Sequence, residues 1–397
     1  MSDDSSRQRS TFLLLATAGL VSGLTIRVAE PLLPSVAASF SVSVVSASGI
    51  VTGFTFAYGA FQLAHGSFGD RFGKLRVASI MLFLAGLASF ACASSDSITA
   101  LMFFRFCTGM TGGALIPLSF AWIGDHFAYE QRQRVLAKFI SGVLIGQSLG
   151  PLLGGASTDL IGWRAAFALL GALYCFIGVC LYLRVRADPV PPQTLKTQGA
   201  VATYWAVAAQ KSVRRICGAV AVEGCLFFGA FAYVGVFMKQ QFQLSYTVIG
   251  VLIAGFGLGG LIYSFSSRRL LRRLGEKGLV RFGGIGLAGG FVLLGWGNEL
   301  AVAVSLVMVG LAFYMFHNTL QTHATEMAPH ARGSAVALFA FSFFVGQALG
   351  AVAFGALARG IGFTASFAFV GIGLLGLSVW FSRFCASPPV TERQATS

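Results

Sequence analysis

The chain has few charged residues, and this shortage sets the first limit on what it can be. Only 11% of its 397 residues are Asp, Glu, Lys or Arg, whereas a soluble globular protein carries about 25%. Hydrophobic residues make up 56%, and the mean hydropathy is +0.77. The net charge is +14, but the basic residues fall in short connections between apolar runs, not on a stripe with exposed aromatics. This pattern argues against nucleic-acid binding and indicates a membrane protein.

Motifs of catalysis and metal binding are also missing. The seven cysteines contain no CxxC pair and lie within or at the ends of apolar runs, which indicates neither a disulfide framework nor a zinc site. There is no phosphate-binding loop, dinucleotide fingerprint, histidine–carboxylate metal spacing or nucleophile elbow. We therefore expect no enzyme activity, no cofactor and no metal. The missing nucleotide site also argues against an activity driven by nucleotide hydrolysis.

Long apolar runs fill most of the sequence. A helix needs about 20 apolar residues to cross the hydrocarbon core, and the lack of alternating polarity excludes an outer-membrane barrel. The expected fold class is an all-α membrane protein with twelve transmembrane helices in two pseudo-symmetric six-helix bundles. The predicted spans are 11–33, 47–68, 76–94, 98–121, 136–157, 164–184, 215–238, 246–266, 279–297, 300–322, 334–358 and 363–384.

The longest polar stretch divides the chain into two parts. It follows the sixth run and contains Asp188-Pro-Val-Pro-Pro192, a composition that resists packing. We predict an N-terminal bundle over 1–185, a cytoplasmic linker over 186–211 and a C-terminal bundle over 212–397.

Lys and Arg also predict the orientation in the membrane. Nearly all of them lie in the segments on the same side as the N-terminus, and only Arg164, Lys239 and Arg359 lie on the other side. The positive-inside rule places both termini in the cytoplasm. We expect a multi-pass protein of a bacterial inner (plasma) membrane.

The two parts resemble each other at a constant offset of 200 residues. Gly146-Gln147-Ser-Leu149-Gly150 in the fifth run matches Gly346-Gln347-Ala-Leu349-Gly350 in the eleventh. Further pairs in the same register are Arg132 with Arg332, Gly155 with Gly355 and Phe167 with Phe367. Internal repetition of this kind predicts paired transporter halves with a substrate site near the midplane between them.

A charged turn separates the second and third runs. Residues 66–76 read GSFGDRFGKLR, and because charges are costly in lipid, the turn belongs at a membrane surface. It resembles the first signature of the major facilitator superfamily, and this resemblance implies a conformational switch whose acid caps a neighbouring helix. The other interpretation is a turn that only marks the surface. The matching residues are Gly66, Asp70, Arg71, Gly73 and Lys74.

Closely spaced glycines mark the fifth run. Glycines four apart line one face of a helix and permit close packing, and a proline bends the helix. The pattern resembles the antiporter motif found chiefly in superfamily members that export drugs and metabolites, which implies outward transport. Packing alone is the other interpretation. The motif consists of Gly142, Gly146, Gly150, Pro151, Gly154 and Gly155.

Arg105 lies well inside the fourth run, in Arg105-Phe-Cys-Thr-Gly109. A guanidinium there needs an acid, water or carbonyl oxygens as partners. The spacing to Gly109 resembles the fourth-helix signature of the superfamily, which is implicated in proton transfer. Alternatively, Arg105 extends to the nearer interface.

Two acidic residues lie within or at the end of apolar runs. Glu30 precedes Pro34 by four residues, similar to a spacing in many twelve-helix drug–proton antiporters, and Arg27 is close enough for a local ion pair. The alternative for Glu30 is an ionised cap at the outer headgroups. Glu223 in the seventh run has only apolar neighbours. We expect Glu30, Arg105 and Glu223 to place titratable groups on both sides of a central cavity.

The tenth run ends in a polar cluster. His317 and Gln321 are four residues apart and share a helical face, so they are candidates for the cavity, where a histidine can carry a proton near neutral pH. His323 and Glu326 are expected to mark the cytoplasmic rim.

These observations predict a secondary transporter that exports small, partly hydrophobic compounds in exchange for protons by alternating access. Its expected partners are the substrate, protons and the lipid bilayer, with no nucleic acid and no obligatory protein partner. The alternatives are a carrier for uptake or export of sugars or metabolites, and a membrane sensor that has lost transport.

Overall fold

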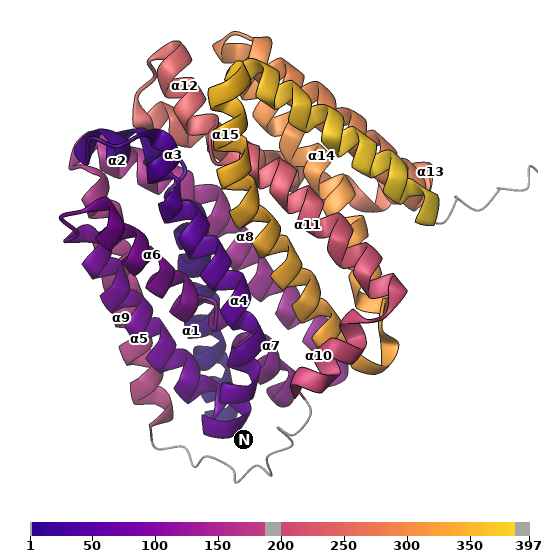
Figure 1. Ribbon diagram of the computed structural model, residues 1–397. Helices are drawn as coiled ribbons and strands as arrows, with labels where there is room; N and C mark the ends of the chain where they lie inside the picture. Colours follow the sequence, from indigo (N-terminus) through magenta and orange to yellow (C-terminus); the bar gives the residue numbers. More distant parts are fainter. Residues whose placement is uncertain (1, 187–199, 386–397) are drawn as a thin grey trace, which may run out of the picture.

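A computed structural model describes residues 2–186 and 200–385, which we call the first and second halves. Within these ranges the regular structure is entirely helical (Figure 1). The first half contains α1 (Ser2–Arg27), α2 (Leu33–Ser39), α3 (Val44–Ala47), α4 (Gly49–Phe72), α5 (Lys74–Ala93), α6 (Ile98–Gly112), α7 (Leu115–His126), α8 (Tyr129–Leu160) and α9 (Trp163–Val185). The second half contains α10 (Ala200–Ala208), α11 (Lys211–Phe231), α12 (Val234–Phe242), α13 (Tyr246–Trp296), α14 (Glu299–Glu326), η1 (Pro329–Ala331), α15 (Arg332–Phe381) and η2 (Ser382–Phe384).

Twelve membrane spans follow from the helix lengths. In the described residues, ten helical segments are long and apolar enough to cross a membrane, but α13 and α15 contain 51 and 50 residues. A straight helix of that length would extend about 75 Å, more than twice the hydrocarbon thickness of about 30 Å. Each instead turns at one glycine in the left-handed region, Gly275 (φ 64°) and Gly362 (φ 79°). Each therefore forms two consecutive spans, and the predicted twelve-helix fold is confirmed.

The internal repeat is visible in the helix packing. A Cβ atom on Gly146 of α8 would collide with the carbonyl oxygen of Leu20 in α1, and one on Gly346 of α15 would collide with that of Ala221 in α11. The next glycine of each pair, four residues further on, repeats the arrangement. Hence α8 packs on α1 as α15 packs on α11, and glycine is required because the two backbones touch.

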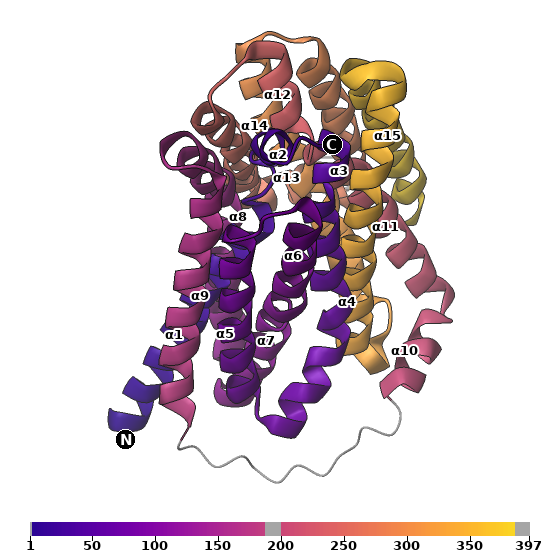
Figure 2. The same ribbon diagram turned by 60° about the vertical axis from the view of Figure 1, so that its left-hand side comes forward.

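The two halves are hydrogen-bonded to each other at one end of the molecule. We call this end, where α2, α3 and α12 lie, the far end, and the opposite end, where the start of α1, the last turn of α9 and α10 lie, the linker end (Figures 1 and 2). At the far end Tyr233 and Ser48 share a hydrogen bond of 3.0 Å between their hydroxyl oxygens, and the carboxylate of Asp159 accepts hydrogen bonds from the start of α13. The halves are therefore joined at the far end.

The predicted linker is only partly described. Residues 187–199, which include the proline-rich stretch, lie outside the described residues. The last part differs from the expectation of a segment that resists packing, because α10 is a helix that packs against α15 and buries Val207. Its sequence, AVATYWAVA, is apolar, which explains why it associates with the bundle.

Candidate functional site

A buried ion pair joins the last residue of α1 to the turn that follows it. Arg27 Nη1 is 2.8 Å from Glu30 Oε1, and the two residues are only 7% and 1% exposed. The guanidinium also lies 3.7 Å from the ring centroid of Phe228 in the second half, a cation–π contact. The local pair expected from the spacing is therefore present, and Glu30 is not an exposed headgroup cap. Its second oxygen, Oε2, is buried without a hydrogen-bond partner.

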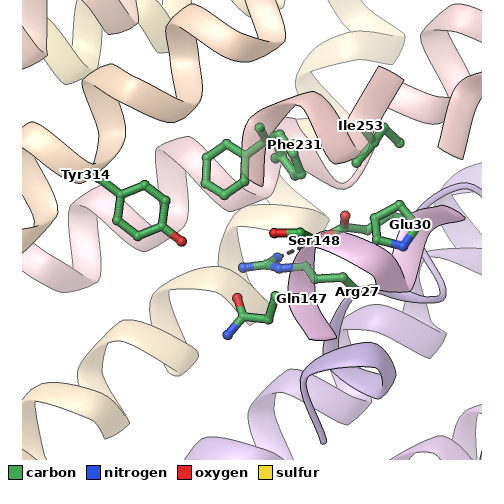
Figure 3. Close-up of a pocket in the computed structure, with 9 residues that line it drawn as sticks. Arg27, Glu30, Gln147, Ser148, Phe231, Ile253 and Tyr314 are labelled. Carbon is green, nitrogen blue, oxygen red and sulfur yellow. Dashed lines mark hydrogen bonds and ion pairs between the residues drawn. The ribbon is translucent and has the colours of Figure 1, made fainter. Parts of the chain in front are cut away.

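This ion pair lines a narrow pocket between the two halves (Figure 3). In Figure 3 the phenol of Tyr314, from α14, points toward the Arg27 guanidinium, and the Gln147 amide lies near the same guanidinium. Apart from the ion pair, the lining is aromatic, aliphatic or uncharged polar. The pocket is lined by Arg27, Glu30, Gln147, Ser148, Pro151, Phe231, Ile253, Phe256 and Tyr314.

The second buried acid has a histidine partner. Glu223 Oε2 on α11 is 2.7 Å from His317 Nδ1 on α14, with side chains 0% and 12% exposed. The imidazole stacks on Phe313, with ring centroids 4.9 Å apart and an interplanar angle of 15°. Glu223 Oε1 is buried without a hydrogen-bond partner. Sequence reasoning named both residues but missed their pairing, because they are 94 positions apart and only tertiary packing brings α11 against α14.

Arg105 is enclosed within the first half. Its Nε donates to the Ile50 carbonyl oxygen at 3.3 Å, its Nη2 to that of Thr25 at 3.5 Å, and the guanidinium lies 4.0 Å from the Phe54 ring centroid. Arg105 is only 1% exposed, so it does not extend to an interface. Its partners are carbonyl oxygens and aromatic rings. Arg105 does not pair with Glu30, whose basic partner is Arg27. Arg105 thus ties α1, α4 and α6 together.

Neither His317 nor its partner Glu223 lines the pocket, and the other polar residues of the tenth run do not line it either. Gln321 is exposed and is not part of the lining. His323 is partly exposed and its Nε2 lies 3.3 Å from Glu276 Oε2, while Glu326 is exposed. Of the two cavity candidates on this helix, only His317 takes part in a buried polar contact.

The charged turn is exposed in this conformation. Gly73, at φ 88°, is the single residue between α4 and α5. Lys74 forms an ion pair with Asp125 at the end of α7 and lies 3.9 Å from Asp70. The Asp70 side chain is 65% exposed, so the capping of a neighbouring helix that the resemblance implies does not occur here. Arg71 lies over the ring of Phe72, 5.0 Å from its centroid. The turn is therefore accessible, and its acid is held only within the first half.

The glycine motif serves two contacts. Four glycines of α8 lie against carbonyl oxygens of α1 and of the turn after it. Gly155 points the other way, where a Cβ atom would collide with the carbonyl oxygen of Tyr246 at the start of α13, and Gly250 of α13 lies against the Pro151 carbonyl oxygen. The motif therefore packs α8 within its own half and also brings the two halves together. The four glycines facing α1 are Gly142, Gly146, Gly150 and Gly154.

Asp159, at the end of α8, contributes to the joint at the far end. Its Oδ2 accepts hydrogen bonds from the backbone N–H (2.6 Å) and hydroxyl (2.7 Å) of Thr247, and its Oδ1 accepts one from the N–H of Tyr246 (3.2 Å). These groups begin α13, so the carboxylate also faces the positive end of that helix. Sequence reasoning missed Asp159, because an acid at a helix end gives no sign of which other helix it meets.

Replacing Asp159 by alanine is expected to loosen the far end. Loss of side-chain hydrogen bonds to the first N–H groups of a helix costs about 1 kcal/mol, which shifts a two-state equilibrium roughly fivefold toward the separated state. Spin labels on Ile161 and Val248, which are 78% and 43% exposed, would report the separation as a distance distribution. Asp96→Ala, which removes an exposed acid of the same half, serves as the control. If the distance distribution is unchanged in Asp159→Ala, Asp159 does not help to hold the two halves together at the far end.

Known proteins resemble the chain over most of its length. A sequence model of the family described as Major Facilitator Superfamily matches residues 15–331 and 216–397. The bicyclomycin resistance protein homolog of Haemophilus influenzae is 23% identical over 372 residues, which cover 87% of this chain and 90% of that protein. The puromycin resistance protein pur8 of Streptomyces alboniger is 26% identical over 381 residues, with 80% and 75% covered. A crystal structure of a bacterial homolog of the human lysosomal transporter Spinster, inward-facing and unoccupied, matches with a TM-score of 0.72 at 16% identity and covers 95% of both chains.

Proposed function

Because the chain belongs to the major facilitator superfamily, and is thus a multi-pass membrane transporter, we propose that it exports small, partly hydrophobic compounds in exchange for protons. The family and fold are those of transporters rather than enzymes. Two relatives are named for resistance to bicyclomycin and puromycin, which supports outward movement of such compounds. The glycine motif on α8, in contact with both α1 and α13, is consistent with this direction.

The observation that carries the proposal is the pair of buried carboxylates, one in each half. Glu30 is held by Arg27 and Glu223 by His317, and each carboxylate keeps one oxygen without a partner. Buried ionisable groups are costly within a membrane protein, so their presence points to a functional role. A proton that reaches either carboxylate cancels its attraction to the basic partner. This change would free the partner and let a conformational change follow from protonation.

The chemistry of the residues that line the pocket supports this class of substrate. Phe231, Phe256 and Tyr314 provide aromatic surface, and the Arg27–Glu30 pair provides both charges. A partly hydrophobic compound with a polar or charged group would fit this combination. Arg105, enclosed in the first half, has a structural role in this scheme.

We further propose that the linker end faces the cytoplasm and that the membrane is a bacterial inner membrane. Basic residues concentrate at this end, which follows the positive-inside rule. With the halves joined at the far end, the described conformation then corresponds to one closed toward the outside. Asp70, exposed at the linker end, would become engaged only when that end closes.

Glu223→Gln is expected to abolish proton-driven transport and retain substrate exchange. Glutamine keeps the size of the side chain and a hydrogen-bonding oxygen for His317 but cannot gain or lose the proton. In vesicles with an imposed pH gradient, accumulation of a substrate found by screening diverse compounds should fall to the background of empty vesicles. Exchange of labelled for unlabelled substrate without a gradient should continue. Glu30→Gln is tested in parallel and should also lose proton-driven transport, because this carboxylate too is buried against a basic partner.

Glu299→Gln provides the matched control, since this acid is exposed at the start of α14. It should accumulate substrate as the unmodified protein does. If Glu30→Gln and Glu223→Gln both retain proton-driven accumulation, proton coupling through these acids is wrong. Exchange of a sugar or metabolite without proton movement would instead identify a carrier of that class, and the absence of any substrate movement would identify a sensor.

A further inference from the structure

Three side chains with metal-binding atoms meet at the rim of the second half, away from the pocket. They are Glu276, His323 and Cys385, and one ligand atom from each lies within 4.8 Å of the others. They come from three separate elements: the start of the second span of α13, the last turn of α14 and the residue after η2. The spacing of cysteines and histidines along the sequence predicted no metal site, because the three residues are far apart in the chain.

The fold explains how the three residues meet. The left-handed turn at Gly275 redirects α13 and places Glu276 at the start of its second span. The short η2 helix, Ser382–Phe384, packs against α13 and carries the chain to Cys385. The end of α15, which leads into η2, lies at the right of Figure 1 beside the label of α13.

Contacts within the cluster hold its members in place. His323 Nε2 lies 3.3 Å from Glu276 Oε2, and the imidazole packs edge-on against Phe381, with ring centroids 5.5 Å apart at 79°. Cys385 is a free, half-buried thiol. The side chains of His323 and Glu276 are 25% and 34% exposed, so a hydrated ion can reach them from solution without opening the bundle.

We propose that Glu276, His323 and Cys385 bind a divalent metal ion of the zinc class. A thiolate, an imidazole nitrogen and a carboxylate oxygen are the ligands that Zn²⁺ takes in proteins, and a fourth, tetrahedral position is left for water. Zn²⁺ bonds are about 2.0–2.3 Å long, so ligand atoms that already lie within 4.8 Å of one another need only small side-chain movements. As the sulfur–metal bond forms, the thiol proton passes to solvent.

A bound ion would join the ends of three spans of the second half. Glu276 begins one span, His323 ends the next and Cys385 follows the last, so the ion acts as a cross-link at this rim. Since the ion binds the folded protein and this geometry is lost on unfolding, it should raise the thermal denaturation midpoint. None of the three ligands lines the pocket, so this site and the proposed transport function can fail independently.

Cobalt(II) binding to the full-length, tag-free protein tests the proposal. The protein in detergent is freed of metal with a chelator, reduced, and titrated with Co²⁺ alone. A Co²⁺ ion held by a thiolate in a tetrahedral site gives near-ultraviolet charge-transfer absorption and visible bands, which should saturate at one ion per chain. One equivalent of Zn²⁺ should remove the bands and raise the thermal midpoint.

Variants show which residues carry the signal. Cys385→Ser should eliminate the charge-transfer absorption, and His323→Ala and Glu276→Gln should each weaken Co²⁺ binding at least tenfold. Cys180→Ser, which changes a half-buried cysteine of α9 in the other half, is the control and should leave the bands intact. Thermal unfolding without metal verifies that each variant is folded. Unmodified protein without charge-transfer absorption, or Cys385→Ser that retains it, would overturn the proposal.

Discussion

Gly155→Val is expected to abolish transport in a protein that still folds. Gly155 lies on the side of α8 that faces the second half, where even a Cβ atom would collide with the backbone carbonyl oxygen of Tyr246. A backbone atom cannot move aside as a flexible side chain can, so the two halves must separate at the far end. A carrier that cannot close at this end cannot complete a cycle of alternating access. Transport should therefore fall to background, a larger effect than that of Asp159→Ala.

The Ile161/Val248 label pair measures this separation directly. In Gly155→Val the distance distribution should move to longer values and no longer respond to substrate. Gly155→Ala should give a smaller change in the same direction. Gly218→Val is the matched control, because no atom lies within 4 Å of a Cβ at this position. Normal transport by Gly155→Val would refute the view that this contact forms during the cycle.

Removing both charges of the Arg27–Glu30 pair should restore the stability that each single variant loses, but it should not restore transport. Glu30→Gln leaves the guanidinium buried without its counter-charge, and such a change costs about 3 kcal/mol. Arg27→Met leaves the Glu30 carboxylate buried without its counter-charge and should cost a similar amount of stability. The double variant removes both charges, and because no unpaired charge stays buried, most of the lost stability should return. Proton-driven transport should not return, since the titratable group is absent.

Thermal denaturation of the four proteins in detergent gives the double-mutant cycle. The coupling energy between the two sites is the effect of the double variant on stability minus the sum of the effects of the two single variants. Vesicle transport by the same four proteins provides the functional comparison. If the double variant is as unstable as the sum of the two single variants, the pair is not coupled. If it transports with full proton dependence, Glu30 does not carry the proton.

Local patterns were sufficient to predict the fold. In lipid, an apolar run of about 20 residues satisfies its backbone hydrogen bonds by forming a membrane-spanning helix. The repeat at an offset of 200 residues indicated two similar bundles. The glycines of α8 and the Arg27–Glu30 pair were also predictable, since both depend on spacing within one helix or turn. In each case the interacting groups are close in sequence or repeat at helical intervals.

The tertiary structure decided which groups meet across long separations. His317 became the partner of Glu223, Asp159 came to accept hydrogen bonds from the start of α13, and Cys385 came to lie beside His323 and Glu276. These contacts depend on how whole helices pack and on turns such as that at Gly275, and no local pattern encodes them. The sequence by itself determined a twelve-helix membrane carrier, because hydrophobicity and periodicity are local properties. Its polar contacts were decided only by the packed helices, because a buried charge takes its partner from whichever helix lies against it.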